Sequence, residues 1–278
     1  MHRRGRARLG STRITAGLRA AVVIAIVATA CSDSPVAWNE TRSEKSQAGD
    51  ALAPDGRLLV DSMALLASRI TPPGPDACPG SLVLTRAGRR LYRAWWRVRP
   101  DSGAVLVAAH SEDGGRVWSA SAPVDTTDRS VTGCRRAPPA IAADSATGYV
   151  HVVFSLLGAE GPGLFYAHSM DAGEMFHSAV PIFYGDRLGR ASVAADGDVV
   201  AVAFEDPNSR VPRIGLALSH TMGHIFEDRL LSISDDDNGI ATRPRVAVRG
   251  RQIAVAWLRG DPTDDRPDAP AVRTGTLR

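Results

Sequence analysis

Residues 110–118 read HSEDGGRVW and residues 168–176 read HSMDAGEMF, so one pattern of His, Ser, Asp, Gly and an aromatic recurs after 58 positions. A degenerate third copy, SHTMGHIF, occupies residues 219–226, with Thr221 in place of the aspartate. Side-chain oxygens of Ser and Asp accept hydrogen bonds from backbone N–H groups in turns, and Gly allows a left-handed backbone. The repeated stretch therefore predicts a tight turn that leads into a core-facing aromatic.

Each copy of this turn ends the third strand of a longer internal repeat. The second strands of the repeat end in an aromatic, and these aromatics are 59, 50 and 53 residues apart: Trp95, Phe154, Phe204 and Trp257. An apolar run and a glycine suited to a hairpin precede each second strand. Third strands are expected at 104–111, 163–169, 214–219 and 271–276. Proline cannot donate to a strand ladder, so Pro123 and Pro181 predict outer edge strands after the turns.

The motif and its spacing resemble the Asp-box repeat of sialidase-type β-propellers, over residues 79–278. The positions that carry the resemblance are Ser111, Asp113, Gly115, Trp118, Ser169, Asp171, Gly173, Phe176, Ser219, Gly223 and Phe226. The resemblance implies an all-β fold, a β-propeller of four-stranded antiparallel blades in which these residues are structural. The repeats predict about four blades, with five or six left open because strands between 57 and 80 are unassigned. The enzymes of this family have six blades.

The fourth repeat stops at Arg278, after its third strand. An open edge leaves unpaired backbone groups, and propellers close their ring with a strand from the other terminus. We therefore expect an N-terminal strand to complete the ring, and we assign it to the apolar stretch RLLVDSMALL (57–66).

The N-terminal segment has the features of an export signal. Residues 1–19 contain six arginines and no acid, and the apolar run AAVVIAIVATA (20–30) follows. The small residues before Cys31 resemble a bacterial lipobox, which implies lipidation of Cys31 and a membrane anchor in the bacterial envelope, at the outer membrane or cell surface. Ordinary cleavage near Ala30 is the alternative. The predicted domains are a signal peptide (1–30), a disordered tether (31–56) and the propeller (57–278).

Composition excludes some classes of function. The chain has 33 basic and 30 acidic residues, but removal of the six signal arginines leaves 27 basic residues, so we expect no nucleic-acid partner. In an oxidising compartment, Cys78 and Cys134 predict a disulfide, with two free thiols as the alternative. SDDDNG (234–239) is acidic but lacks EF-hand spacing, and no CxxC or HExxH occurs, so we expect no metal or cofactor.

Candidate ligand-binding residues lie on the face opposite the predicted turns. The links that enter the innermost strands place Arg136, Arg190 and Arg243 at the channel mouth, where guanidinium groups could bind a carboxylate. The resemblance implies the same, since sialidase-type enzymes bind the sialic-acid carboxylate with three arginines. The alternative is that an arginine-rich chain places arginines on every surface.

Catalytic candidates are weaker. A sialidase-type enzyme would need a tyrosine nucleophile, a carboxylate base and a separate acid. Tyr184 lies in a link that could face the mouth, and Glu205 and Asp206 are acids on the same face, but no tyrosine stands beside an obvious glutamate. The sequence thus favours a non-catalytic propeller that binds a glycan or a protein. An exo-sialidase-like glycoside hydrolase and a structural or assembly component of the envelope are the alternatives.

Overall fold

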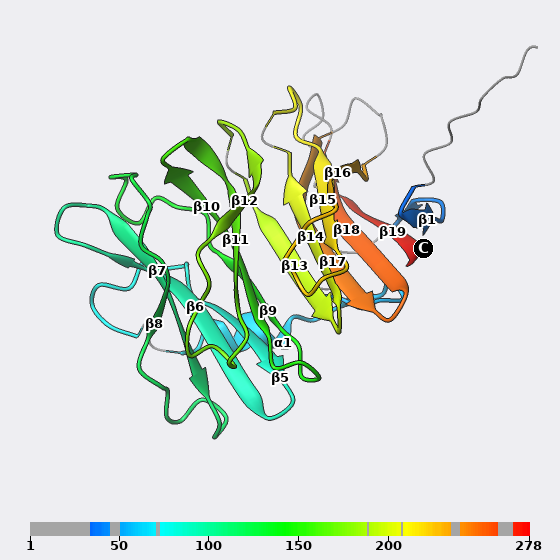
Figure 1. Cartoon of the computed structure of the whole chain (residues 1–278). Helices are drawn as coiled ribbons and strands as arrows, with labels where there is room; N and C mark the ends of the chain where they lie inside the picture. Colours follow the sequence, from blue (N-terminus) through cyan, green and yellow to red (C-terminus); the bar gives the residue numbers. More distant parts are fainter. Residues whose placement is uncertain are drawn as a thin grey trace, which may run out of the picture. The chain divides into compact units, whose positions relative to one another are not determined.

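The computed structural model describes residues 34–44, 51–70, 73–187, 189–206, 208–234, 240–260 and 269–278, with the backbone alone at 229–231. About half of these residues lie in the strands of four antiparallel sheets (Figure 1). The predicted signal peptide and Cys31 lie outside the described residues. Within the described part of the chain, no helix is long and apolar enough to cross a membrane.

The first three sheets follow the predicted repeat, with each strand hydrogen-bonded to the next along the chain. The first sheet comprises β5 (Val83–Ala87), β6 (Arg90–Val98), β7 (Ala104–Ser111) and β8 (Ala122–Asp125). The second comprises β9 (Ala140–Ala143), β10 (Val150–Gly158), β11 (Gly161–Ser169) and β12 (Val180–Tyr184). The third comprises β13 (Ala191–Asp196), β14 (Val199–Glu205), β15 (Ile214–Ser219) and β16 (Asp228–Ser232). Pro123 and Pro181 lie on the outer strands β8 and β12, as predicted.

The fourth sheet is completed by a strand from the N-terminal segment. It comprises β17 (Ile240–Arg249), β18 (Gln252–Gly260) and β19 (Ala269–Leu277), and β1 (Val36–Trp38) pairs with β19. Val36 lies opposite Leu277, and β2 (Arg42–Ser43) also pairs with β19. An N-terminal strand therefore completes the sheet, as expected, but it comes from the segment predicted to be a disordered tether. No closed ring is formed by the described residues.

The assignment of 57–66 to the closing strand is wrong. These residues contain β4 (Leu58–Leu59), which pairs with β3 (Ala51–Leu52), and helix α1 (Ser62–Ala67). The side chain of Asp61 accepts hydrogen bonds from the backbone N–H groups of Met63 and Ala64 and so caps the helix. Met, Ala and Leu are strong helix formers, which explains why this short apolar run is helical.

The core lies between successive sheets. Trp96 and Leu106 of the first sheet pack with Phe154 of the second in one cluster, and Val153 and Phe204 join the second and third sheets in another. Leu216 and Trp257 belong to the cluster between the third and fourth sheets. Alternate residues of a middle strand face opposite neighbours, so these strands are apolar throughout.

The sheets have two distinct ends. At one end lie the hairpins between the first and second strands and the Ser-x-Asp-x-Gly turns; we call this end the turn face. Hydrogen bonds join its hairpins in series, since Asp144 accepts from the N–H of Gly197 and Asp196 from that of Gly250. The opposite end carries the links between sheets and the first residues of the innermost strands β5, β9, β13 and β17, which contact one another in turn. We call this end the cavity face.

Candidate functional site

A cavity of about 820 Å³ opens on the cavity face. Residues near the start of all four innermost strands line it, together with α1 and the segment before β5. Trp95, Ile141 and Val193 contribute apolar wall, and three arginines, Arg190, Arg243 and Arg245, also line it. A concave site that combines apolar side chains with a few charged groups is a common form of small-ligand site.

Two of the three arginines that line the cavity, Arg190 and Arg243, are held in place through their backbones by one carboxylate. Glu205, at the end of β14, accepts the N–H of Arg190 at 3.1 Å with one oxygen and the N–H of Arg243 at 2.9 Å with the other. Both arginine side chains are exposed, and neither guanidinium has a hydrogen bond or ion pair with the described residues. Glu205, predicted as a candidate acid catalyst, thus joins the third and fourth sheets and positions two arginines.

Arg243 has an unusual backbone conformation. Its φ is 51°, in the left-handed region that non-glycine residues rarely occupy, and the register of β17 on β18 shifts between Thr242 and Arg245. Strained backbone of this kind is often found at ligand sites, where the surrounding contacts maintain it. Here the hydrogen bond that the N–H of Arg243 donates to Glu205 supports this conformation, and the residue at this shift lines the cavity.

The third predicted arginine, Arg136, does not line the cavity. Its side chain is 5% exposed and forms an ion pair with Asp128 at 2.7 Å. It also donates to the carbonyl oxygens of Ser130 and Gly133. Because these partners occupy its guanidinium, Arg136 stabilises the link between the first and second sheets and is not available to a ligand. The sequence could not show this, since Asp128 and Arg136 have the spacing of an ordinary loop.

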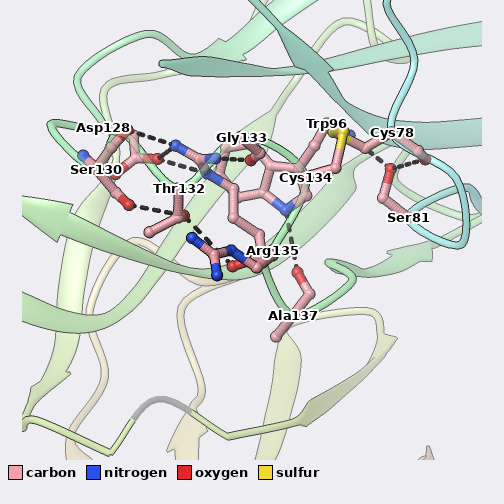
Figure 2. Close-up of a disulfide and its surroundings, with 11 residues drawn as sticks. Cys78, Ser81, Trp96, Asp128, Ser130, Thr132, Gly133, Cys134, Arg135 and Ala137 are labelled. Carbon is pink, nitrogen blue, oxygen red and sulfur yellow. Dashed lines mark hydrogen bonds and ion pairs between the residues drawn. A yellow bond between two sulfur atoms is a disulfide. The ribbon is translucent and has the colours of Figure 1, made fainter. Parts of the chain in front are cut away.

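The predicted disulfide is confirmed and lies in the same link. Cys78 and Cys134 are bonded, with their Cα atoms 5.1 Å apart, and they are 56 positions apart in sequence. Figure 2 shows Trp96 beside the bridge, and its indole N–H donates to the carbonyl oxygen of Ala137. The bridge ties the segment before β5 to the link that enters β9, so it fixes two walls of the cavity.

Tyr184 has a carboxylate partner that the sequence did not reveal. Its hydroxyl donates to Glu160 at 2.7 Å, and this hydrogen bond raises the pKa of Tyr184. Glu160 lies in the hairpin between β10 and β11, 24 residues away, so only the pairing of β11 with β12 brings the two together. Neither residue lines the cavity. Asp206 does not line it either; its carboxylate accepts the N–H of Asn208 in a local turn.

The Ser-x-Asp-x-Gly turns lie on the turn face and hold themselves together. In the second turn, Asp171 accepts hydrogen bonds from the hydroxyl of Ser169 and the N–H groups of Glu174 and Met175. The hydroxyl of Ser169 accepts the N–H of Gly173. The first turn repeats these contacts through Ser111, Asp113 and Gly115, and Ser219 and Gly223 repeat one of them in the third. The aspartates are saturated by their own turns and lie away from the cavity.

The aromatic residue of each turn contacts its own turn or the sheets. Phe226 packs against the ring of Tyr166, and the indole N–H of Trp118 donates to the carbonyl oxygen of Gly115. Phe176 packs against the cluster between the first and second sheets. The three motif aromatics therefore close their turns against the body of the sheets.

Buried histidines fill the space behind the second turn. His151 is fully buried, with Nδ1 2.6 Å from the hydroxyl of Tyr166, and the ring of His168 lies 4.7 Å from those of His177 and His224. Burial lowers the pKa of both His151 and His168 to about 4. The Nε2 atoms of these two residues have no hydrogen-bond partner in the described part of the chain.

The described residues contain no His, Cys, Asp and Glu cluster that could hold a metal ion, and residues 235–239 of the acidic run lie outside them.

The cavity offers binding groups but few catalytic ones. Among its described lining residues the one carboxylate is Asp61, whose oxygen is used to cap α1. Two guanidinium groups without partners among the described residues, carried by residues that line a cavity, can bind a carboxylate or another anion by charge-assisted hydrogen bonds.

Comparisons with known proteins give structural matches alone. No family model matches the chain, and no curated protein matches it. Among solved structures, the Hadza microbial sialidase Hz136 is 17% identical, with a TM-score of 0.49 over 71% of this chain and 46% of that one. A mutant of NanB sialidase from Streptococcus pneumoniae is 16% identical, with a TM-score of 0.46 over 71% and 30%. A family 117 glycoside hydrolase from Zobellia galactanivorans is 12% identical, with a TM-score of 0.42 over 75% and 64%.

The chain thus spans less than half the length of these two sialidases. At such identities and TM-scores the matches carry no conclusion about activity.

Proposed function

We propose that the chain is a β-propeller, tethered to a bacterial envelope through Cys31, that binds a carboxylate-bearing glycan in its cavity without cleaving it. The observation that carries the proposal is the pair Arg190 and Arg243, which line the cavity and whose guanidinium groups have no partner among the described residues. Glu205 holds both backbones, so the two side chains start from fixed positions. Pre-organised groups lose less entropy when they bind a ligand.

The chemistry of the cavity favours binding over hydrolysis. Glycoside hydrolysis requires an acid and a second catalytic group on either side of the scissile bond. The one carboxylate among the described lining residues, Asp61, is occupied by two N–H groups of α1. The apolar wall formed by Trp95, Ile141 and Val193 suits the carbon face of a sugar ring.

A comparison of sialyllactose with lactose tests this function, since the two differ by a sugar that carries a carboxylate. The purified chain should bind sialyllactose in calorimetry and should not bind lactose. Arg190→Ala and Arg243→Ala should each weaken binding by roughly 10- to 100-fold, the value of a charge-assisted hydrogen bond. Arg249→Ala is the matched control, because Arg249 is an exposed arginine on the same strand β17 but at the turn face. Equal affinity for the two sugars would contradict the proposal.

A sialidase-like hydrolase is the second candidate, and the Tyr184–Glu160 pair is the observation that favours it. A tyrosine paired with a carboxylate is the nucleophile that such an enzyme requires. The pair lies outside the cavity lining, and the raised pKa of Tyr184 keeps its hydroxyl protonated. Turnover of a fluorogenic sialoside that is lost in Tyr184→Phe would establish this function in place of the first.

A further inference from the structure

Three exposed apolar side chains occupy the same place in the three turns. Val117, Met175 and Ile225 each precede the motif aromatic, and they are 69%, 71% and 60% exposed. Their N–H groups donate to Asp113, Asp171 and Thr221, respectively. Because the turn fixes these backbones, it holds the three side chains outward. Single exposed apolar residues are common, but a set at equivalent positions on one face marks an interaction surface.

Around these three residues, several arginines have no ion-pair partner, whereas many of the acidic side chains are already hydrogen-bonded. On the turn face, Arg86, Arg89, Arg116 and Arg249 are exposed and form no ion pair with the described residues. Many of the acids on this face are occupied: Asp113 and Asp171 bind their own turns, and Asp144 and Asp196 bind the next hairpin. Asp198 is exposed and has no such contact. Apolar tips next to unpaired arginines suit the interface of a lipid layer.

The path of the chain connects this face to the predicted anchor. β1 begins at Val36, which pairs with Leu277, and the neighbouring residue Thr276 pairs with Gln252 just after the hairpin between β17 and β18. The chain therefore enters the sheets at the turn face. Cys31 is five residues before Val36 in sequence. Even a fully extended segment of this length spans at most about 18 Å, which limits how far an anchor at Cys31 could hold the turn face from the lipid layer.

We propose that the turn face is the surface that docks on the membrane, with Val117, Met175 and Ile225 entering the headgroup region of the lipid layer. This proposal rests on the anchor at Cys31 in the proposed function. It goes beyond that function because it also fixes the orientation of the sheets on the membrane. The cavity, at the other end of the sheets, then opens away from the membrane. The turn face would add a second contact with the lipid layer to the one that the anchor makes.

A matched pair of labelled positions tests the orientation. Met175 and Val131 are both 71% exposed, but Val131 lies in the link between β8 and β9 on the cavity face. Met175→Cys and Val131→Cys are made in the full chain, expressed in a bacterial host and labelled with an environment-sensitive fluorophore. The lipidated protein is reconstituted in vesicles of phosphatidylcholine and phosphatidylglycerol that contain a brominated lipid quencher. We expect quenching at position 175 and none at position 131.

A second arm separates the orientation from the anchor. In the Cys31→Ser background, the same vesicles should still bind the protein weakly. The triple variant Val117→Ser, Met175→Ser and Ile225→Ser should lower the partition coefficient by about tenfold or more. If the parent chain carries no lipid at Cys31 and position 175 is still quenched, the anchor is refuted and the docking surface stands. Membrane attachment with equal or no quenching at the two positions would overturn the docking surface. If the chain dimerises and the triple variant abolishes the dimer, the docking proposal would also be overturned, because the turn face would then bind a second copy of the chain.

Discussion

Glu205 accepts the backbone N–H of Arg243 at 2.9 Å across 38 residues of sequence, and its other oxygen accepts that of Arg190. One carboxylate thus joins two sheets and sets the relative position of two of the three arginines that line the cavity. Glu205→Ala should lower the free energy of unfolding by about 1–2 kcal/mol, since two hydrogen bonds are lost. It should also weaken sialyllactose binding, although Glu205 need not touch the sugar. Glu205→Gln retains one acceptor oxygen. Its free energy of unfolding, measured with urea, and its sialyllactose affinity, measured by calorimetry, should lie between those of the parent chain and those of Glu205→Ala. Unchanged binding in Glu205→Ala would show that the arginines do not depend on this carboxylate.

Arg243→Gly should separate stability from binding. The left-handed φ of 51° costs an arginine free energy that glycine does not lose. The variant should therefore be as stable as the parent chain or more stable by up to about 1 kcal/mol, while binding is lost with the guanidinium. Arg190→Gly is the control, because Arg190 has no positive φ, and it should lose both stability and binding. A destabilised Arg243→Gly chain in thermal unfolding would mean that the side chain, not the backbone, stabilises this segment.

Removal of the disulfide should destabilise the fold. The bridge between Cys78 and Cys134 closes a loop of 56 residues, which restricts the unfolded chain. The double variant Cys78→Ser and Cys134→Ser should lose about 2–4 kcal/mol in the free energy of unfolding. Reduction of the parent chain with dithiothreitol should give the same loss in urea titrations. If the double variant unfolds at the same urea concentration as the oxidised parent, the bridge contributes nothing to stability.

Acid should weaken the fold through the buried histidines. His151 and His168 have pKa values of about 4 in the folded chain, below the value of 6.5 expected when unfolded. Between these values the unfolded chain binds more protons, so stability is full above about pH 6.5 and falls as the pH drops toward 4. Urea unfolding at a series of pH values measures this loss, and His168→Phe should reduce its slope. His177→Gln, at an exposed position in the same cluster, is the control and should retain most of the slope. A slope that His168→Phe leaves unchanged would assign the pH dependence to other groups.

The turn aspartates should matter for stability and not for ligand binding. Asp171→Ala removes the acceptor of three hydrogen bonds and should cost about 1–2 kcal/mol, as the loss of a helix cap does. Sialyllactose affinity should stay the same, because this turn lies at the end of the sheets opposite the cavity. Asp198→Ala, at an exposed aspartate of the same face without a side-chain hydrogen bond to the described residues, should change neither quantity. A drop in affinity in Asp171→Ala would refute the separation of the two faces.

Much of the candidate site depended on contacts that have no local signal. Arg190 and Arg243 were predictable because each lies where the chain enters an innermost strand, Arg190 just before β13 and Arg243 in the first half of β17, and both residues line the cavity. Arg136 stands in a similar position but turns toward Asp128, because the buried ion pair and two carbonyl oxygens hold its guanidinium. The role of Glu205 was not predictable, since its partners lie 15 and 38 residues away and are backbone groups.

Local chemistry determined the repeat. Alternation of apolar residues sets the strands, and the Ser, Asp and Gly positions set the turns, because these preferences act within a few residues of one another. The tertiary structure alone decided which segment completes the fourth sheet. Val36–Trp38 lies in a polar stretch without periodicity, and its partner Leu277 is 241 positions away in sequence. The apolar run at 57–66 had the better local signal for a strand, yet Asp61 caps a helix there. The edge of β19 is instead paired by β1.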